Sequence, residues 1–370
     1  MGTLHTVYRL TITTLSPLHI GTGNILRQGY DYVVHNNQTW VIDPGTLAGM
    51  LYDQDPDDFE RMVRGAPASD LIRPNEYDPA SPLFRYVMKG QPRSGKQGAE
   101  IQEQIKDPWD RPYIPGSSLK GALRTALAFV GWENRGITLD IRQIGNNPKS
   151  AGHQLEEQIL YGKESKPYYD LLRAIQVSDS APDEDSHLQL LNVQVVTRNK
   201  TGLPIELEAI PRGVTFTATL TLDGFLRQPE YAEKLGWQSE DQLKWLKKLP
   251  QIVNYFTTHR IDQERARWAN SHPMLHSFYD TLVRNLRDER TEFLLQLGWG
   301  GGWDSKTFAG HLTSDSGVFY QIVKRFERQM DRQKSFKKND PYPKSRRVVV
   351  REQVPTMPLG WIRVRMERVE

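Results

Sequence analysis

The chain has 370 residues, a formal net charge of +3 and no cysteine. This length allows a large core in one elaborated domain or two, and the lack of cysteine excludes disulfides, thiol catalysis and cysteine-ligated zinc. No apolar run approaches the roughly 20 residues that a membrane span requires, so we expect no membrane contact. The missing thiols favour a reducing, cytoplasmic setting.

Charge is unevenly distributed along the chain. Residues 321–370 contain 14 Lys and Arg against 6 Asp and Glu, so this tail carries +8 and the remainder carries −5. We expect an anionic partner to be attracted to the tail. Nine Trp and fifteen Tyr add aromatic surface on which bases can stack. The composition therefore permits RNA binding without demonstrating it.

The N-terminal segment predicts the first strand of a sheet. Apolar and polar residues alternate from Thr6 to Thr14, as in a half-buried strand. The loop Leu15–Gly23 follows, with a proline and two glycines that allow a tight backbone. Tyr30–Val34 and Trp40–Ile42 then predict a β-hairpin.

Residues 52–112 lack sustained periodicity. They contain eight prolines and an acidic cluster between Asp53 and Glu60. We interpret them as an insertion of short helices and loops. Because an unstructured loop of this length is unusual in a compact domain, we expect it to pack against a neighbour or to become ordered on assembly.

The most informative stretch is residues 113–124, Tyr-Ile-Pro-Gly-Ser-Ser-Leu-Lys-Gly-Ala-Leu-Arg. Apolar residues at three- and four-residue spacing predict a helix with one packed face: Leu119, Ala122, Leu123, Ala126, Leu127 and Val130. Gly116, Ser117 and Ser118 offer a serine N-cap and free backbone N–H groups, and Lys120 and Arg124 stand in the first two turns. This combination predicts an anion site, with phosphate as the obvious anion. The alternative is a capped, packed helix whose two cations face water.

Four strands are predicted in the middle of the chain. Two lie at residues 175–177 and 188–196. Residues 205–209 and 214–222 alternate on either side of the turn Ile210–Gly213, which predicts an antiparallel hairpin with one buried face. Arg212 at its tip is a candidate phosphate contact, or simply a solvated turn residue.

Two helices follow the predicted hairpin. Ser239 and Gln242 form a capping-box pattern that opens a helix through Leu249, and Pro250 ends or kinks it. A second helix runs past Pro273 with four residues turned inward: Leu275, Tyr279, Leu282 and Leu286. A short apolar strand at residues 293–297 then leads into a glycine-rich loop.

The glycine-rich loop covers residues 298–307, Gly-Trp-Gly-Gly-Gly-Trp-Asp-Ser-Lys-Thr. It lacks the ending of a P-loop and the spacing of a dinucleotide fingerprint, so nucleotide hydrolysis is not expected. Gly300, Gly301 and Gly302 allow close approach of a ligand, while Trp299 and Trp303 are candidates for base stacking and Lys306 for a phosphate contact. The alternative is a glycine turn with two buried tryptophans.

The C-terminal region combines basic residues with a last strand. Residues 319–330 predict an amphipathic helix, and a basic run follows at Lys334–Lys338 and continues with Lys344, Arg346 and Arg347. A solvated helix face explains such charges as well as a nucleic-acid patch does. Residues 362–366 alternate as a final strand after Pro358-Leu-Gly-Trp.

Residues 114–124 resemble the signature helix of the RAMP superfamily of CRISPR proteins. The His19-Ile-Gly turn, the run Glu208–Phe216 and the glycine-rich loop are also similar to segments of this family. With the late Pro358-Leu-Gly-Trp element, the order of these motifs resembles that of the 3′-end-capping subunits of type III-A (Csm-type) effector complexes. Backbone subunits of such complexes are considerably shorter.

The resemblance implies an α+β fold: an RRM-like (ferredoxin-like) antiparallel sheet with helices on one face, enlarged by insertions and a C-terminal extension. We expect a RAMP domain at 1–225, including the insertion at about 52–112, and a helical and β region at 226–370 with the glycine-rich loop and basic tail. The candidate RNA-binding residues are Gly116, Ser117, Ser118, Lys120, Arg124, Arg212, Gly300, Gly301, Gly302, Trp303 and Lys306.

The resemblance also implies a non-catalytic role without a cofactor. The protein would hold the 3′-proximal part of the CRISPR RNA, cap the filament of backbone RAMP subunits and help to define guide length. Its expected partners are CRISPR RNA and a backbone subunit, with a host nuclease for 3′ trimming as a further candidate. The equivalent capping subunit of another type III complex is an alternative assignment.

A rival from another class is a RAMP endoribonuclease, either metal-independent or metal-assisted. His19 is the candidate general acid or base, and Asp31 lies in a place roughly comparable to that of the aspartate in target-cleaving backbone subunits. Against this, an isolated turn histidine is usually structural, and Asp31 falls within a strand pattern. No clustered carboxylate or histidine signature of a metal nuclease is present in the sequence.

Overall fold

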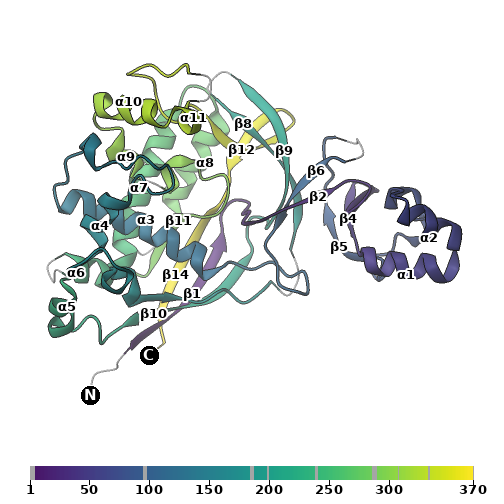
Figure 1. Cartoon of the computed structure of the whole chain (residues 1–370), viewed down its shortest axis with the longest axis horizontal. Helices are drawn as coiled ribbons and strands as arrows, with labels where there is room; N and C mark the ends of the chain where they lie inside the picture. Colours follow the sequence, from purple (N-terminus) through teal and green to yellow (C-terminus); the bar gives the residue numbers. More distant parts are fainter. Residues whose placement is uncertain are drawn as a thin grey trace.

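The fold is built on two sheets of mainly antiparallel strands, with most of the helices on the outer side of one of them (Figure 1). The computed structural model describes residues 5–94, 98–183, 187–197, 200–237, 241–285, 290–306, 308–331 and 334–369. Strand β1 (His5–Thr14) confirms the predicted first strand and lies at the centre of the first sheet.

The first sheet has the strand order β11-β14-β1-β10-β7. Its other members are β7 (Ile175–Val177), β10 (Thr215–Asp223), β11 (Glu292–Gln296) and β14 (Trp361–Arg368). Leu10 of β1 lies opposite Ala218 on one side and Met366 on the other, and all neighbours are antiparallel. Buried and more exposed residues alternate along much of β1, β10 and β14, because successive side chains of a strand point to opposite faces of the sheet.

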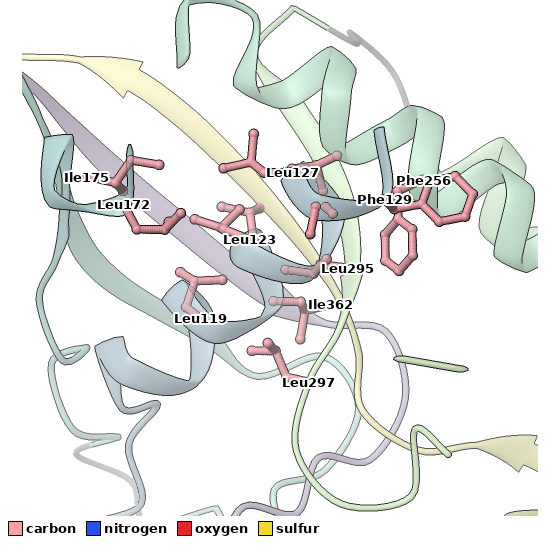
Figure 2. Close-up of a cluster of buried hydrophobic side chains, with 14 of the residues drawn as sticks. Leu119, Leu123, Leu127, Phe129, Leu172, Ile175, Phe256, Leu295, Leu297 and Ile362 are labelled. Carbon is pink, nitrogen blue, oxygen red and sulfur yellow. The ribbon is translucent and has the colours of Figure 1, made fainter. Parts of the chain in front are cut away.

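Two long helices cover the apolar face of this sheet. Helix α3 (Gly116–Asn134) joins β1 to β7, and α7 (Leu249–Trp268) joins β10 to the last strands, with α8 (Pro273–Arg284) packed on α7. Setting aside β11, the order β14-β1-β10-β7 with these connections is the ferredoxin-like arrangement. Figure 2 shows Leu119, Leu123 and Leu127 of α3 against Leu172, Ile175, Leu295, Leu297 and Ile362. The predicted fold class is confirmed.

The second sheet has nine strands. They are β2 (Gly21–Arg27), β3 (Tyr32–His35), β4 (Gln38–Ile42), β5 (Phe84–Lys89), β6 (Glu100–Gln104), β8 (Gln189–Val196), β9 (Thr201–Ala209), β12 (Arg346–Arg351) and β13 (Val354–Pro358). The order is β2-β6-β9-β8-β5-β4-β3, with β12 paired to β8 and β13 paired to β12. The predicted β3–β4 hairpin is confirmed, and the left-handed φ angles of Asn36 and Asn37 form its turn.

The predicted hairpin between residues 205–209 and 214–222 is wrong. Strand β9 pairs with β8 and β6 in the second sheet, whereas β10 pairs with β1 and β7 in the first. The intervening turn crosses between the sheets: Ile210 bridges Leu18, and the Gly213 N–H donates to the carbonyl of Thr14 at 2.8 Å. Alternation identified the buried face of each strand correctly but carried no information about its partner.

The prediction of an insertion made only of short helices and loops is wrong in part. Helices α1 (Pro44–Gln54) and α2 (Pro56–Val63) do lie here, but residues 52–112 also supply strands β5 and β6 of the second sheet. Together with β3 and β4, the two helices enclose a separate apolar core that includes Trp40, Leu47 and Phe84. This α1–α2 unit projects from the body of the molecule (Figure 1).

The remaining helices are short: α4 (His153–Leu160), α5 (Pro229–Leu235), α6 (Gln242–Lys247), α9 (Ala309–Leu312), α10 (Ser316–Arg325) and α11 (Glu327–Met330). The single helix predicted at 319–330 is therefore two, divided at Phe326. Pro250 lies in the first turn of α7, and Pro273 likewise opens α8. The predicted roles of Ser239 and Leu286 fall outside the described residues. Within the described chain, no helix has the length and apolarity of a membrane span.

The N-terminus of α3 packs directly on the end of β7, which makes one glycine irreplaceable. A Cβ at Gly116 would lie 2.3 Å from the carbonyl oxygen of Val177 and 2.6 Å from that of Ser178. We predict that Gly116→Ala lowers the free energy of unfolding by about 3 kcal/mol, because both obstacles are backbone atoms. Urea denaturation followed by circular dichroism measures this change.

Gly121 in the same helix provides the matched control. A Cβ at this position meets nothing within 4 Å, so Gly121→Ala should raise stability by about 1 kcal/mol through helix propensity alone. Equal effects of the two substitutions would contradict the packing described here.

Candidate nucleic-acid interface

The three motifs found in the sequence meet at one groove of about 780 Å³. The His19–Gly21 turn leads into β2, the first turns of α3 form a second wall, and the start of the glycine-rich loop closes the base. The lining residues include His19, Gly21, Asn24, Glu103, Ser117, Ser118, Gly121, Arg124, Thr125, Glu156, Gln296, Gly298, Trp299, Ser305 and Lys306. Residues far apart in the chain therefore share one concave surface, as expected of a binding site.

The predicted serine N-cap of α3 is wrong. The helix begins at Gly116 after Pro115, no side chain caps it, and the Gly116 N–H donates to the carboxylate of Asp179 at 2.7 Å. The positive end of the helix dipole is thus already matched by an internal anion. The hydroxyls of Ser117 and Ser118 have no hydrogen-bond partner among the described residues, and both line the groove.

Arg124 is held in ion pairs within the protein. Its guanidinium binds Asp170 at 2.7 Å and Glu156 at 3.1 Å. Burial alone would lower the pKa of Arg124, but the charges of Asp170 and Glu156 raise it above its usual value. Lys120, one turn earlier, does not line the groove, and burial lowers its pKa. The predicted pair of free cations on α3 is therefore corrected to one internally neutralised arginine and one half-buried lysine.

His19 is buried, with 1% of its surface exposed. Its Nδ1 lies 2.7 Å from the carbonyl oxygen of Glu208, so Nδ1 carries the proton and donates. Burial lowers the pKa of His19, which leaves the ring neutral at neutral pH. The carbonyl of His19 accepts a hydrogen bond from the Trp299 N–H at 2.8 Å, which joins the His19–Gly21 turn to the glycine-rich loop.

The glycines of the loop approach protein atoms closely. A Cβ at Gly298, whose φ is +70°, would lie 2.2 Å from the carbonyl oxygen of His19. Gly300 is packed on Leu359, and Gly301 is packed on Ser305. Both glycines are buried. We therefore explain the glycine content by close packing of the loop on the two sheets.

The two tryptophans of the loop have different surroundings. Trp299 lines the groove, and the guanidinium of Arg347 lies 4.7 Å from its ring centroid. Trp303 instead packs edge-on to Tyr342, with ring centroids 5.1 Å apart, and lines a neighbouring cavity. Lys306, at the boundary of the groove and that cavity, is exposed and has no ion pair within the described chain.

Two other candidates lie away from the groove. Asp31 accepts the Arg27 N–H at 2.7 Å in the turn between β2 and β3. Arg212 is exposed at the turn between the sheets and lines a different cavity beside Phe278 of α8. Neither is among the groove residues.

Charge in the groove is balanced. Glu103 and Glu156 face Arg124 and Lys306. Burial alone would raise the pKa of Glu103, but hydrogen bonds from Asn24 and Thr22 and the charge of Lys106 lower it. Among the described residues, no group of three His, Cys, Asp or Glu side chains is placed to hold a metal ion.

Much of the basic tail is paired internally. Arg346, which the sequence analysis places in a basic run, is buried. Its Nε donates to Glu264 at 3.0 Å, and its Nη2 donates to both Glu264 and Asp304. Glu264 lies on α7 and Asp304 on the 3₁₀ turn Trp303–Ser305, so the cluster anchors the glycine-rich loop. The sequence does not distinguish Arg346 from its solvated neighbours, because the two carboxylates that pair with it lie 82 and 42 residues away in the chain.

The buried cluster predicts a pH-dependent contribution to stability. Burial alone would raise the pKa of Glu264, but Arg346, Arg267 and Arg260 lower it below its usual value. A carboxylate with a lowered folded-state pKa stabilises the fold above its unfolded pKa of about 4.3, and that stabilisation is lost as the pH falls through the folded value. Glu264→Gln should therefore cost about 3–5 kcal/mol at neutral pH.

Denaturant unfolding across a pH series measures this effect. The difference between the wild type and Glu264→Gln should stay constant at neutral pH and shrink below about pH 4. Glu230→Gln, which breaks an exposed pair with Lys234, is the control and should leave the unfolding midpoint nearly unchanged at every pH, because solvent screens exposed ion pairs. A pH-independent difference would contradict the charged state assigned to Glu264.

Comparison with known proteins agrees with this architecture. The family model of the RAMP superfamily matches residues 11–303. The chain is 28% identical over 238 residues to "CRISPR system Cms protein Csm5" of Streptococcus thermophilus, covering 58% of this chain and 64% of that protein. It is 25% identical over 351 residues to the Mycobacterium tuberculosis protein of the same name, covering 83% and 84%.

Solved structures show the same similarity. One chain of the "Csm-crRNA-target RNA ternary complex in type III-A CRISPR-Cas system" matches with a TM-score of 0.73 and 25% identity, over 97% of this chain and 100% of that one. The crystal structure of T. onnurineus Csm5 matches with a TM-score of 0.68 and 25% identity, over 95% and 99%. With the family match extending over more than half of its length, this chain belongs to the RAMP superfamily.

Proposed function

We propose that the chain is a non-catalytic, RNA-binding subunit of a type III-A CRISPR effector complex, and that its groove holds the 3′-proximal part of the CRISPR RNA. The observation that carries the proposal is the meeting of the His19 turn, α3 and the glycine-rich loop at one groove. It is supported by the likeness to a chain of a Csm-crRNA-target RNA complex and to proteins named Csm5.

The groove surface suits a single RNA strand. Among the described residues, the hydroxyls of Ser117 and Ser118 have no hydrogen-bond partner, and Lys306 has no ion pair. These groups match phosphate oxygens and 2′-hydroxyls, which position RNA without reading its sequence. Trp299, with Arg347 over its ring, offers a stacking surface for a base.

The acidic groups of the groove suit contacts with the riboses and bases of RNA better than contacts with its phosphates. Glu103 and Glu156 would repel phosphates, yet their carboxylates can accept hydrogen bonds from 2′-hydroxyls or base amines. The few unpaired cations imply a shallow dependence of affinity on salt, because each neutralised phosphate on a single strand adds about 0.7 to the slope.

The position in the complex is part of the proposal. We place the chain at the end of a filament of backbone RAMP subunits, where it caps the CRISPR RNA and helps to set guide length. The α1–α2 unit projects from the body and is the segment we assign to contact with a neighbouring subunit (Figure 1). A host nuclease that trims the 3′ end would act on RNA emerging from the groove.

Lys306 gives the sharpest test of the groove. We predict that Lys306→Ala weakens binding of single-stranded RNA. The slope of log affinity against log salt should become shallower by about 0.7, from a wild-type value of about −2. Fluorescence anisotropy with a labelled oligouridine over a salt series measures both quantities.

The control for this experiment is Lys247→Ala. Lys247 is also an exposed lysine without an ion pair in the described chain, but it lies on α6 and lines neither cavity. If the slope is unchanged in Lys306→Ala, or falls equally in both variants, the assignment of Lys306 is refuted.

The endoribonuclease alternative makes an opposite prediction. With His19 buried and its Nδ1 committed to Glu208, and with Asp31 outside the groove, the proposal expects no cleavage of labelled CRISPR RNA by the purified protein, with or without divalent metal. Electrophoresis of the RNA after incubation provides the measurement. Cleavage that His19→Ala or Asp31→Ala abolishes would overturn the non-catalytic assignment.

A further inference from the structure

A second cavity of about 640 Å³ opens beside the groove. Its walls come from the loop at 148–152, the start of α4, the turn at 303–306 and helices α10 and α11. The two cavities share Glu156 and Lys306 in their linings, so they adjoin at these residues.

The interior of this cavity is aromatic and aliphatic. Its apolar lining includes Leu155, Trp303, Phe308, Ile322, Phe326 and Tyr342. Phe308, Ile322 and Phe326 are buried, and Trp303 stands perpendicular to Tyr342 with an interplanar angle of 88°. A volume between about 300 and 1,000 Å³ with a mainly apolar lining is typical of a site for a small molecule or chemical group.

Charge at the mouth favours an anionic chain. Lys149 and Lys306 are exposed and have no ion pair in the part of the chain that the structure describes. The carboxylate of Glu156 is paired with Arg124, which also pairs with Asp170. An apolar interior with a cationic rim matches a nucleotide, whose base is apolar on its faces and whose phosphate is anionic.

From these observations we infer that the second cavity receives one unstacked base of the RNA strand that runs along the groove, while Lys149 and Lys306 hold the flanking phosphates. This inference rests on the proposed function and extends it. Single-stranded RNA commonly presents splayed bases to aromatic side chains.

Gly152 permits a test that leaves the aromatic core intact. Its backbone has φ −90°, and a Cβ there would point at the Phe308 ring at 3.6 Å, which is ordinary contact. Gly152→Leu should therefore fill the cavity from its rim, and Gly152→Ala should fill it only slightly. Replacing Trp303 is avoided because it packs against Tyr342 and Phe319.

The probe is an oligouridine with a single 2-aminopurine placed at each position in turn, bound to the full-length protein. We expect one position to show a distinct fluorescence change from stacking in the cavity, which Gly152→Leu abolishes and Gly152→Ala retains. The same Leu variant should weaken binding of the oligonucleotide about tenfold, as expected for loss of one stacked base. Lys149→Ala should also weaken it, and Lys247→Ala should not.

The outcomes separate the two claims. If the oligouridine fails to bind the wild type, the proposed function itself fails. If it binds, but no position responds to Gly152→Leu, the base site is refuted and the groove assignment stands. If Gly152→Leu leaves RNA fluorescence unchanged and instead impairs assembly with a neighbouring subunit, the cavity holds protein, and the inference is likewise overturned.

Discussion

The hydrogen bond from the Trp299 N–H to the carbonyl of His19 is the contact on which the groove depends. It holds the glycine-rich loop on the turn that follows β1, and Gly298 with its left-handed φ is the residue that lets the two backbones meet. Because β1 also pairs with β10 and β14 at the centre of the first sheet, the turn is fixed by the most connected strand of that sheet. A rigid sheet therefore positions residues from three distant segments, which is how binding loops are usually organised.

Ion pairs hold two of the segments that form the groove in place. Arg346 pairs with Glu264 of α7 and with Asp304 of the glycine-rich loop and so anchors the loop. Arg124 ties α3 to Glu156 and Asp170. The groove surface also presents the hydroxyls of Ser117 and Ser118, the ring of Trp299 and the cation of Lys306, beside the carboxylate of Glu103. Under the proposed function, such a surface would hold RNA by hydrogen bonds and stacking more than by bulk attraction, which suits a subunit whose target recognition would be delegated to base pairing.

The sequence predicted where most strands and helices lie, but not which strands pair or which charged residues form ion pairs. Alternation located β1, β10 and β14, and helical spacing located the buried face of α3, because both depend only on which residues avoid water. Alternation could not show that β9 and β10 belong to different sheets, since pairing is a long-range property. The motifs at residues 116–124 and 298–306 both contribute residues to the groove. The ion pairs of Arg124 and Arg346 could not be inferred from the sequence, because their carboxylate partners lie 32 or more residues away.

The most direct test of the account is position-resolved crosslinking in the assembled ribonucleoprotein. A guide RNA carrying 4-thiouridine near its 3′ end should crosslink to this chain, with modified peptides that contain Trp299 or Lys306, whereas the same nucleotide near the 5′ end should not. Crosslinks to this chain only from the 5′ end, or none from either end, would contradict the claim that the groove holds the 3′-proximal RNA.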